Sequence, residues 1–339
     1  MKTLTASILF LASMVAAGAQ APAPAPYKLV EKLDRTLDQI VAQDAVLEKV
    51  APGTGVFEGP TWIPGRPGYL IFTDVASDVI YKLGPDGTVS IAVDNIHTDP
   101  DRGLLRDTGV NGMLKLSGPD GTAVDRQGRI TYCEFSGGRV VRVEKDGTRT
   151  VLADRFEGHR LNNPNDLVYK SDGSLYFTDW GADTTRPDDD PAKSVPHRGV
   201  YRVKDGKLEL MSKEFSPNGI AFSPDEKYLY ITQAMRKLVR FDVRPDGTLA
   251  NGHIFFDLDI DKRFGSPDGL KTDKDGNVYS TGPGGIWIIS PSGKHLGTLL
   301  APMQRFVNFT FGGDDGKSLY IAAPEALYRV ALKSSRLRR

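Results

Sequence analysis

The stretch "SPDGLKTDKDGNVYSTG", residues 266–282, contains a turn, a short apolar run, a second turn and a strand. The same order of residue types returns in "SPNGIAFSPDEKYLYITQ" (216–233) and in "NPNDLVYKSDGSLYFTD" (163–179). In each stretch a Pro precedes an Asn or Asp, and the second strand carries an aromatic residue. One phrase repeated at long intervals is the sequence signature of a repeat fold.

Three further stretches follow this phrase more loosely: "VFEGPTWIPGRPGYLIFTD" (56–74), "SGPDGTAVDRQGRITYCEF" (117–135) and "FVNFTFGGDDGKSLYIAAP" (306–324). Asp-Gly turns between the phrases, as in "EKDGTRTVLAD", predict outer hairpins. A repeat of roughly 40–60 residues with about four short strands is typical of a propeller blade. We therefore predict an all-β, six-bladed β-propeller with four-stranded blades.

The segment before the first phrase predicts how the ring closes. "AVLEKVA" (45–51) reads as a spare strand that completes the last blade beside "ALYRVAL" (326–332). This pairing would cover two exposed strand edges. Further upstream, "YKLVEKLDRTLDQIV" (27–41) spaces Leu29, Leu33, Leu37 and Ile40 as in a short amphipathic helix.

The N-terminal residues predict export from the cytoplasm. "MKTLTASILFLASMVAAGAQ" (1–20) contains Lys2, an apolar stretch and the small-residue sequence Ala17-Gly18-Ala19. This order indicates a secretory signal peptide over residues 1–19, with a retained anchor helix as the alternative. An Ala/Pro linker over residues 20–26 and a single propeller domain over 27–335 follow. We expect the mature protein in the periplasm or outside the cell.

The overall charge argues against two classes of partner. Forty-three basic residues balance 43 acidic ones in the 339-residue chain, so no global field attracts nucleic acid or an acidic membrane. The single cysteine, Cys133, cannot form an internal disulfide, and its β-rich surroundings predict a buried, inert thiol.

One oxygen-bearing residue marks the start of each repeat. Equivalent positions of propeller blades surround one axis, so we expect these side chains to form a ring at the mouth of the central channel. The alternative is that they are ordinary turn residues, because Asn and Asp favour turns. The second turns of the repeats, such as "SDG" and "KDG", already carry residues of that kind. The ring consists of Glu58, Asp120, Asn165, Asn218, Asp268 and Asn308.

Carboxylate and amide oxygens without thiolates suit a hard cation, Ca²⁺ before Mg²⁺ or Mn²⁺. The five histidines form no H-x-H or HExxH pair, which argues against a dedicated zinc site. No G-x-G-x-x-G or P-loop motif indicates a nucleotide cofactor, and no G-x-S-x-G motif indicates a serine nucleophile.

Four motifs give the chain a specific resemblance. "FEGPTW", "NNPNDLVYKSDGSLYFTDWG", "SPNGIAFSPDEKYLYIT" and "SPDGLKTDKDGNVY" are similar, in this order, to motifs of the SMP-30/gluconolactonase/luciferin-regenerating-enzyme-like family. The resemblance covers about residues 40–332. It implies a calcium-dependent six-bladed lactonase with one divalent cation, with Mg²⁺, Mn²⁺ or Zn²⁺ as alternatives to Ca²⁺. The cation ligands that it implies are Glu58, Asn165, Asn218 and Asp268.

The resemblance also implies that Asp268 is catalytic, as a base or nucleophile, with a ligand-only role as the alternative. Asp120 is a candidate for lining the pocket or holding a water. Asn163 and Asn308 are candidates for bonding substrate hydroxyls, or else solvated turn residues. Phe135 stands where similar sequences often have His, so a role for that histidine is not expected here.

Two long insertions are candidates for lids. Residues 97–113 and 180–199 are longer than hairpins require, and long polar loops are usually functional lids or disordered segments. We expect Arg102, Arg106 or His197 to contact the substrate, with a mobile surface as the alternative.

The function expected from these features is metal-dependent opening of a lactone ring, for example that of the sugar lactone glucono-1,5-lactone. One alternative is a hydrolase of another ester or a phosphotriester on the same scaffold. The other is a non-catalytic, ligand-binding propeller with a structural ion, because propellers serve many functions. The expected partner is a small molecule, and the sequence gives no oligomeric state.

The predicted signal peptide can be tested by the mass of the exported protein. Cleavage after Ala19 gives a mature chain that starts at Gln20. Intact-mass spectrometry of protein recovered from outside the cytoplasm should give that mass. A protein that keeps residues 1–19 would instead support the retained anchor.

Overall fold

The structure, a computed structural model, describes residues 27–53, 55–96, 103–107, 112–181, 194–234, 236–302, 305–324 and 326–337. The predicted signal peptide, the linker and Arg102 lie outside the described residues, as do parts of both candidate lids. No described helix has the length and apolar character needed to cross a bilayer.

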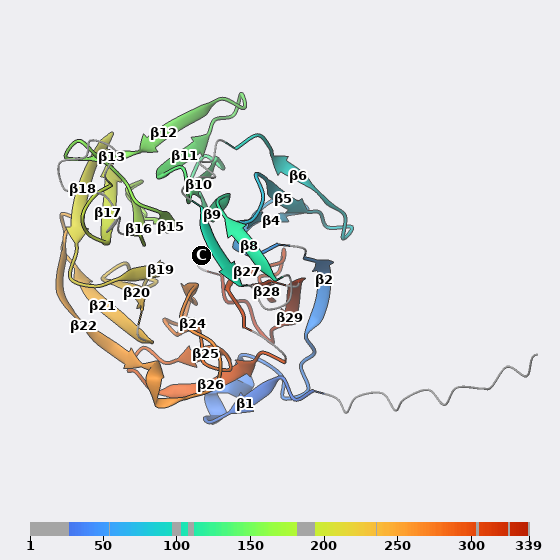
Figure 1. Ribbon diagram of the computed structural model, residues 1–339. Helices are drawn as coiled ribbons and strands as arrows, with labels where there is room; N and C mark the ends of the chain where they lie inside the picture. The colour runs from blue at the N-terminus through green and yellow to red at the C-terminus, as the bar shows by residue number, and fades with distance from the viewer. Residues whose placement is uncertain are drawn as a thin grey trace, which may run out of the picture.

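Six of the antiparallel sheets in the described residues have four or five strands and are arranged as blades around one axis (Figure 1). Blade 1 comprises β3 (Phe57–Ile63), β4 (Tyr69–Asp74), β5 (Ile80–Leu83) and β6 (Val89–Val93). Blade 2 comprises β9 (Pro119–Val124), β10 (Ile130–Glu134), β11 (Arg139–Val143) and β12 (Arg149–Ala153). Blade 3 comprises β15 (Pro164–Tyr169), β16 (Leu175–Asp179), β17 (Gly199–Lys204) and β18 (Lys207–Ser212).

The second half of the ring has the same order of strands. Blade 4 comprises β19 (Pro217–Phe222), β20 (Tyr228–Gln233), β21 (Lys237–Val243) and β22 (Leu249–Asp257). Blade 5 comprises β23 (Leu270–Thr272), β24 (Val278–Gly282), β25 (Gly285–Ile289) and β26 (His295–Leu300). Blade 6 comprises β27 (Asn308–Gly312), β28 (Ser318–Ala323), β29 (Ala326–Ala331) and β2 (Glu48–Pro52). The six-bladed, four-stranded propeller predicted from the repeat is confirmed.

Smaller elements join the blades. Two hairpins, β7 (Leu104–Asp107) with β8 (Met113–Leu116) and β13 (Arg155–Phe156) with β14 (His159–Arg160), lie in the connections on either side of blade 2. A short 3₁₀ helix, η3 (Leu258–Ile260), follows blade 4.

The ring closes through the predicted N-terminal strand. β2 pairs antiparallel with β29, with Lys49 opposite Tyr328 and Ala51 opposite Leu327. The first and last parts of the propeller therefore share blade 6. This pairing gives the outer edge of β29 a partner, as the sequence predicts.

The predicted N-terminal helix is wrong. Residues 30–32 form a strand instead, β1 (Val30–Lys32), which pairs with β26 and gives blade 5 a fifth strand. Only a single 3₁₀ turn, η1 (Arg35–Gln39), follows it. Leu29 and Leu37 are buried, whereas Leu33 is 58% exposed. The open edge of β26 supplies main-chain hydrogen bonds to this segment, and tertiary pairing overrides a weak helical pattern.

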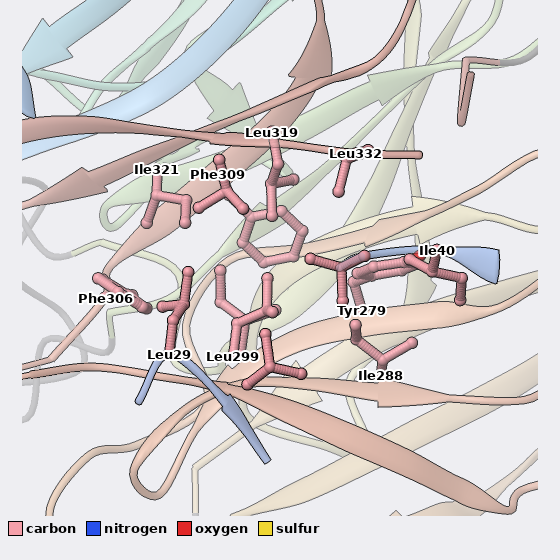
Figure 2. Packing of buried hydrophobic residues seen from close by; sticks show 14 of the residues in the cluster. Leu29, Ile40, Tyr279, Ile288, Leu299, Phe306, Phe309, Leu319, Ile321 and Leu332 are labelled. Atoms are coloured by element: carbon pink, nitrogen blue, oxygen red, sulfur yellow. The ribbon is translucent and has the colours of Figure 1, made fainter. Parts of the chain in front are cut away.

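The apolar core lies between neighbouring blades. In the largest cluster, Tyr279 and Ile288 of blade 5 pack against Phe309 and Ile321 of blade 6 (Figure 2). Leu29 from the N-terminal segment joins the same cluster. Each blade thus buries its faces against its two neighbours.

A second cluster joins blade 6 to blade 1 and so stabilises the closure. Leu327 on β29 is fully buried and packs in one cluster with Ala51, Phe57 and Phe72. The rings of Phe57 and Phe72 meet edge to face at 4.9 Å between centroids. The apolar contacts at this seam hold the two ends of the chain together.

Truncation of this seam should destabilise the whole ring. We expect Leu327→Ala to lower the free energy of unfolding by roughly 2–5 kcal/mol, because it opens a cavity in a fully buried cluster. The matched change Leu33→Ala, at a residue that is 58% exposed, should change it by less than about 0.5 kcal/mol. Urea unfolding followed by tryptophan fluorescence measures both. Equal effects of the two variants would contradict the packing described.

Candidate metal centre inside the ring of inner strands

Residues at the start of four inner strands leave the regular ladder. The pairing register shifts within 58–61 of β3, 119–122 of β9, 164–167 of β15 and 217–220 of β19. A bulge frees a residue from strand pairing and redirects its side chain. The ring residues of blades 1 to 4 all lie in these shifted segments, which explains why the same local phrase recurs there.

Glycine follows a ring residue where the next blade comes close. A Cβ atom on Gly219 would lie 2.3 Å from the carbonyl oxygen of Asp268. The Gly219 N–H donates to that same oxygen at 3.1 Å. A Cβ atom on Gly121 would likewise lie 2.5 Å from the carbonyl oxygen of Asn165, so neither position has room for a side chain. Consecutive ring residues are therefore close neighbours across the blades.

All four predicted metal ligands line one pocket. The pocket is open to solvent and has a volume of about 430 Å³. Its acidic and amide lining consists of Glu58, Asp120, Asn165, Asn218 and Asp268. The other described residues around it are one cation, Arg305, and the apolar Val56, Val75, Leu104, Leu116, Phe135, Trp180 and Val307. The structure thus brings the predicted ligand set together.

Two of these ligands are oriented by neighbouring side chains. Asn308 Nδ2 donates to Glu58 Oε2 at 2.7 Å, and the Gly59 N–H donates to the same oxygen at 2.6 Å. Asn165 Nδ2 donates to Asp120 Oδ2 at 2.8 Å. With its NH₂ group used in this way, the oxygen of the Asn165 amide is the atom left to bind a cation.

The carboxyl groups of the pocket are buried close to one another. Burial, followed by the negative charge of Asp268, raises the pKa of Glu58 to about 8. Burial also raises the pKa of Asp120, and the charges of Glu58 and Asp268 act in the same direction. No Lys or Arg of the described residues lies within ion-pair distance of Glu58 or Asp120. A divalent cation would supply the missing positive charge.

The donor set fits a hard cation. Two carboxylates and two amide oxygens are ligands that Ca²⁺, Mg²⁺ and Mn²⁺ accept, and Ca²⁺ takes six to eight oxygens. Four protein ligands would leave positions for water and substrate. Across the part of the chain that the structure describes, no group of three or more His, Cys, Asp or Glu side chains is arranged to hold a metal ion. The candidate centre therefore depends on Asn165 and Asn218.

The remaining candidates for substrate binding lie in different places. Asp120 lines the pocket and holds Asn165. Asn308 is buried behind Glu58, and Asn163 donates from Nδ2 to the carbonyl oxygen of Phe135 at 3.1 Å. His197 lies 3.1 Å from the Tyr201 hydroxyl and is not among the described residues that line the pocket.

Both candidate lids are described only in part. Arg102 lies outside the described residues, and the structure describes Arg106 only as part of the β7 backbone. Leu104 of the first lid and Trp180 of the second line the pocket. The predicted contacts of Arg102 and Arg106 with the substrate stay predictions.

The apolar side of the pocket is absent from the sequence prediction. Val56, Val75, Leu116, Phe135 and Val307 form one buried cluster, and Trp180 packs against it. The ring centroids of Phe135 and Trp180 lie 6.3 Å apart. Phe135 thus packs in the wall of the pocket.

Comparisons with known proteins agree with this arrangement. The family model described as "SMP-30/Gluconolactonase/LRE-like region" matches residues 56–324. A gluconolactonase of Zymomonas mobilis subsp. mobilis is 32% identical over 321 residues, which cover 90% of this chain and 86% of the relative. The family-model region, residues 56–324, includes all six ring residues.

Solved structures share the fold. A gluconolactonase from Xanthomonas campestris has a TM-score of 0.74 and 28% identity, and the match covers 89% of this chain and 94% of that one. A calcium-binding regucalcin from Agrobacterium tumefaciens has a TM-score of 0.61 and 17% identity, over 86% of this chain and 98% of that one. The second likeness shows the fold alone.

The raised pKa of Glu58 predicts how stability depends on pH without a cation. The folded state keeps the Glu58 proton up to about pH 8, whereas the unfolded state releases it near the ordinary pKa of 4.5. Between these values the folded state binds more protons, so stability falls as pH rises, by on the order of 1.4 kcal/mol per pH unit. Urea unfolding in the presence of a chelator, from pH 5 to 8, measures this slope. Glu58→Gln should reduce the slope, and part of it should remain because burial also raises the pKa values of Asp120 and Asp179. Equal slopes for both proteins would contradict the prediction.

Proposed function

The chain belongs to the SMP-30/gluconolactonase/LRE-like family, and we propose that this lactonase opens the ring of a sugar lactone at one divalent cation held by Glu58, Asn165, Asn218 and Asp268. Ca²⁺ is the first candidate for the cation and glucono-1,5-lactone for the substrate. The observation that carries the proposal is the meeting of these four side chains, from four different blades, in one pocket.

The cation, when bound, supplies polarisation of the substrate carbonyl and a more acidic water. Glu58 and Asn165 hold it with oxygens that Asn308 and Asp120 orient through hydrogen bonds. These fixed orientations keep the donor oxygens in place before the substrate arrives, which favours catalysis.

We assign the role of general base to Asp268. This residue lines the pocket and is partly exposed, so one carboxylate oxygen can take a proton from the water that attacks the lactone carbonyl. Its backbone is fixed on both sides, because its N–H donates to Thr281 Oγ1 at 2.8 Å and its carbonyl accepts from Thr232 Oγ1 at 2.7 Å. The proton taken up then passes to the leaving alkoxide as the ring C–O bond breaks.

The apolar side of the pocket favours a second candidate substrate. Phe135, Trp180 and Leu104 offer carbon surface beside the acidic groups. Such a wall binds an alkyl or aryl substituent better than a hydroxyl-rich one. A hydrolase of an apolar ester or lactone is therefore the alternative on the same scaffold. The N-terminal sequence predicts that either reaction takes place in the periplasm or outside the cell.

Removal of the cation tests the proposal. The mature protein, stripped with a chelator, should lose hydrolysis of glucono-1,5-lactone in a pH-indicator assay, and Ca²⁺ should restore it. Parallel assays with an aryl lactone and a simple ester identify the preferred class. A stripped protein that keeps full activity would contradict the metal centre. A protein that binds Ca²⁺ and hydrolyses none of these compounds would support a non-catalytic binding propeller.

Asp268→Asn tests the base separately. We expect kcat to fall by roughly 10²–10⁴-fold, because an amide cannot take the proton. The variant should remain folded and bind Ca²⁺ less tightly. The control Asp259→Asn changes an exposed carboxylate that pairs with Lys262, and its kcat should equal that of the wild type. Unchanged kcat in Asp268→Asn would reduce Asp268 to a ligand.

A further inference from the structure

A buried threonine recurs at one position of the second strand in four blades. It is the residue before the last in β4, β16, β20 and β24, and it is fully buried in each case. In the first three of these blades the hydroxyl donates to the main-chain carbonyl of the ring residue in the next blade along the chain, whereas Thr281 on β24 accepts from the Asp268 N–H. The three donated bonds join Thr73 to Asp120 at 2.9 Å, Thr178 to Asn218 at 2.6 Å and Thr232 to Asp268 at 2.7 Å.

Two of these three hydroxyls also accept a hydrogen bond from their own blade. The Asp166 N–H donates to Thr178 Oγ1 at 3.1 Å, and the Gly219 N–H donates to Thr232 Oγ1 at 2.6 Å. Each hydroxyl therefore bridges the bulge of one blade to the ring residue of the next. A buried hydroxyl that both donates and accepts fixes both partners.

The ring ligands are thus held in two different ways. Glu58 and Asn165 are oriented through their side chains, by Asn308 and Asp120. In the blades that precede them, Ala322 and Cys133 occupy the position of the threonine. Asn218 and Asp268 instead have their backbones held by a threonine hydroxyl.

We propose that Thr178 and Thr232 are positioning residues for the cation centre, which set the placement of Asn218 and Asp268 across the blade boundary. This inference rests on the proposed function, because it assigns these hydroxyls a role at the cation site. Thr→Val keeps the shape of the side chain and removes the hydroxyl. In Thr232→Val, the Asp268 carbonyl loses the hydroxyl bond and keeps the 3.1 Å bond from the Gly219 N–H.

Calcium affinity, measured by titration calorimetry on the mature protein, tests the inference together with Tm and the separate values of kcat and KM. Thr232→Val should weaken Ca²⁺ binding by about tenfold or more, because the Asp268 carbonyl loses the 2.7 Å bond that fixes the backbone of this ligand. Thr232→Ser restores the hydroxyl and should bind within about threefold of the wild type.

The control is Thr272→Val. Thr272 is also buried and donates across the same boundary between blades 5 and 4, to the carbonyl oxygen of Phe222 at 2.6 Å. Phe222 is the last residue of β19 (Pro217–Phe222), so this bond lies at the other end of the inner strand from Asn218. Loss of this bond should lower Tm about as much as Thr232→Val and leave the Ca²⁺ affinity within about twofold of the wild type. If Thr232→Val does not fold, Thr178→Val makes the same comparison at Asn218.

The outcomes separate this inference from the proposed function. If the wild type is a calcium-dependent lactonase and both variants keep its Ca²⁺ affinity, only the positioning role is overturned. If Thr232→Val and Thr272→Val lose affinity equally, the positioning role is also overturned, because equal losses indicate general loosening of the blades. A wild type that binds no divalent cation overturns the proposed function and this inference with it.

Discussion

Negative charge, buried close together at the axis of the ring, is the constraint on which the site depends. Glu58 and Asp120 are almost fully buried, and Asp268 is close enough to raise the pKa of both. Carboxyl groups in such a place either keep their protons or require a nearby positive charge. The described chain offers neither of the two buried groups an ion pair, and it surrounds them with amide groups whose oxygens can also bind a cation. The same charges that lower the stability of the empty site favour a doubly charged ion in it.

The propeller provides the geometry that this clustering requires. No local segment of the chain could bring Glu58 and Asp268 together, since 210 residues separate positions 58 and 268 in the sequence. The inner strands of successive blades contact one another all the way around the ring, so short-range contacts between blades are enough to set the long-range arrangement. The pairing of β2 with β29 closes that ring. The stability of the seam and the precision of the site are consequently linked, because an open ring would let the inner strands spread.

Much of this was predictable from the sequence, because the repeat carries both fold and site. The blade count and the six ring residues follow from one phrase whose period is a property of the fold itself, and the closing strand follows from the spare segment 45–51 before it. The N-terminal helix was wrong, because Leu29 and Leu37 are buried by pairing with an edge strand that the local sequence does not reveal. The threonines that hold Asn218 and Asp268 were missed, since a Thr inside a β-strand carries no functional signal until the neighbouring blade is in place. The apolar wall around Phe135 was missed for a similar reason, because its members come from different blades and share no spacing.

The central claim is that one cation sits among four side chains from four blades. Anomalous diffraction from crystals grown with Mn²⁺ in place of Ca²⁺ locates such an ion directly. The account predicts a single strong peak within about 2.0–2.6 Å of oxygens from Glu58, Asn165, Asn218 and Asp268, with further coordination positions not taken by protein. A peak elsewhere, or none at this pocket, would contradict it.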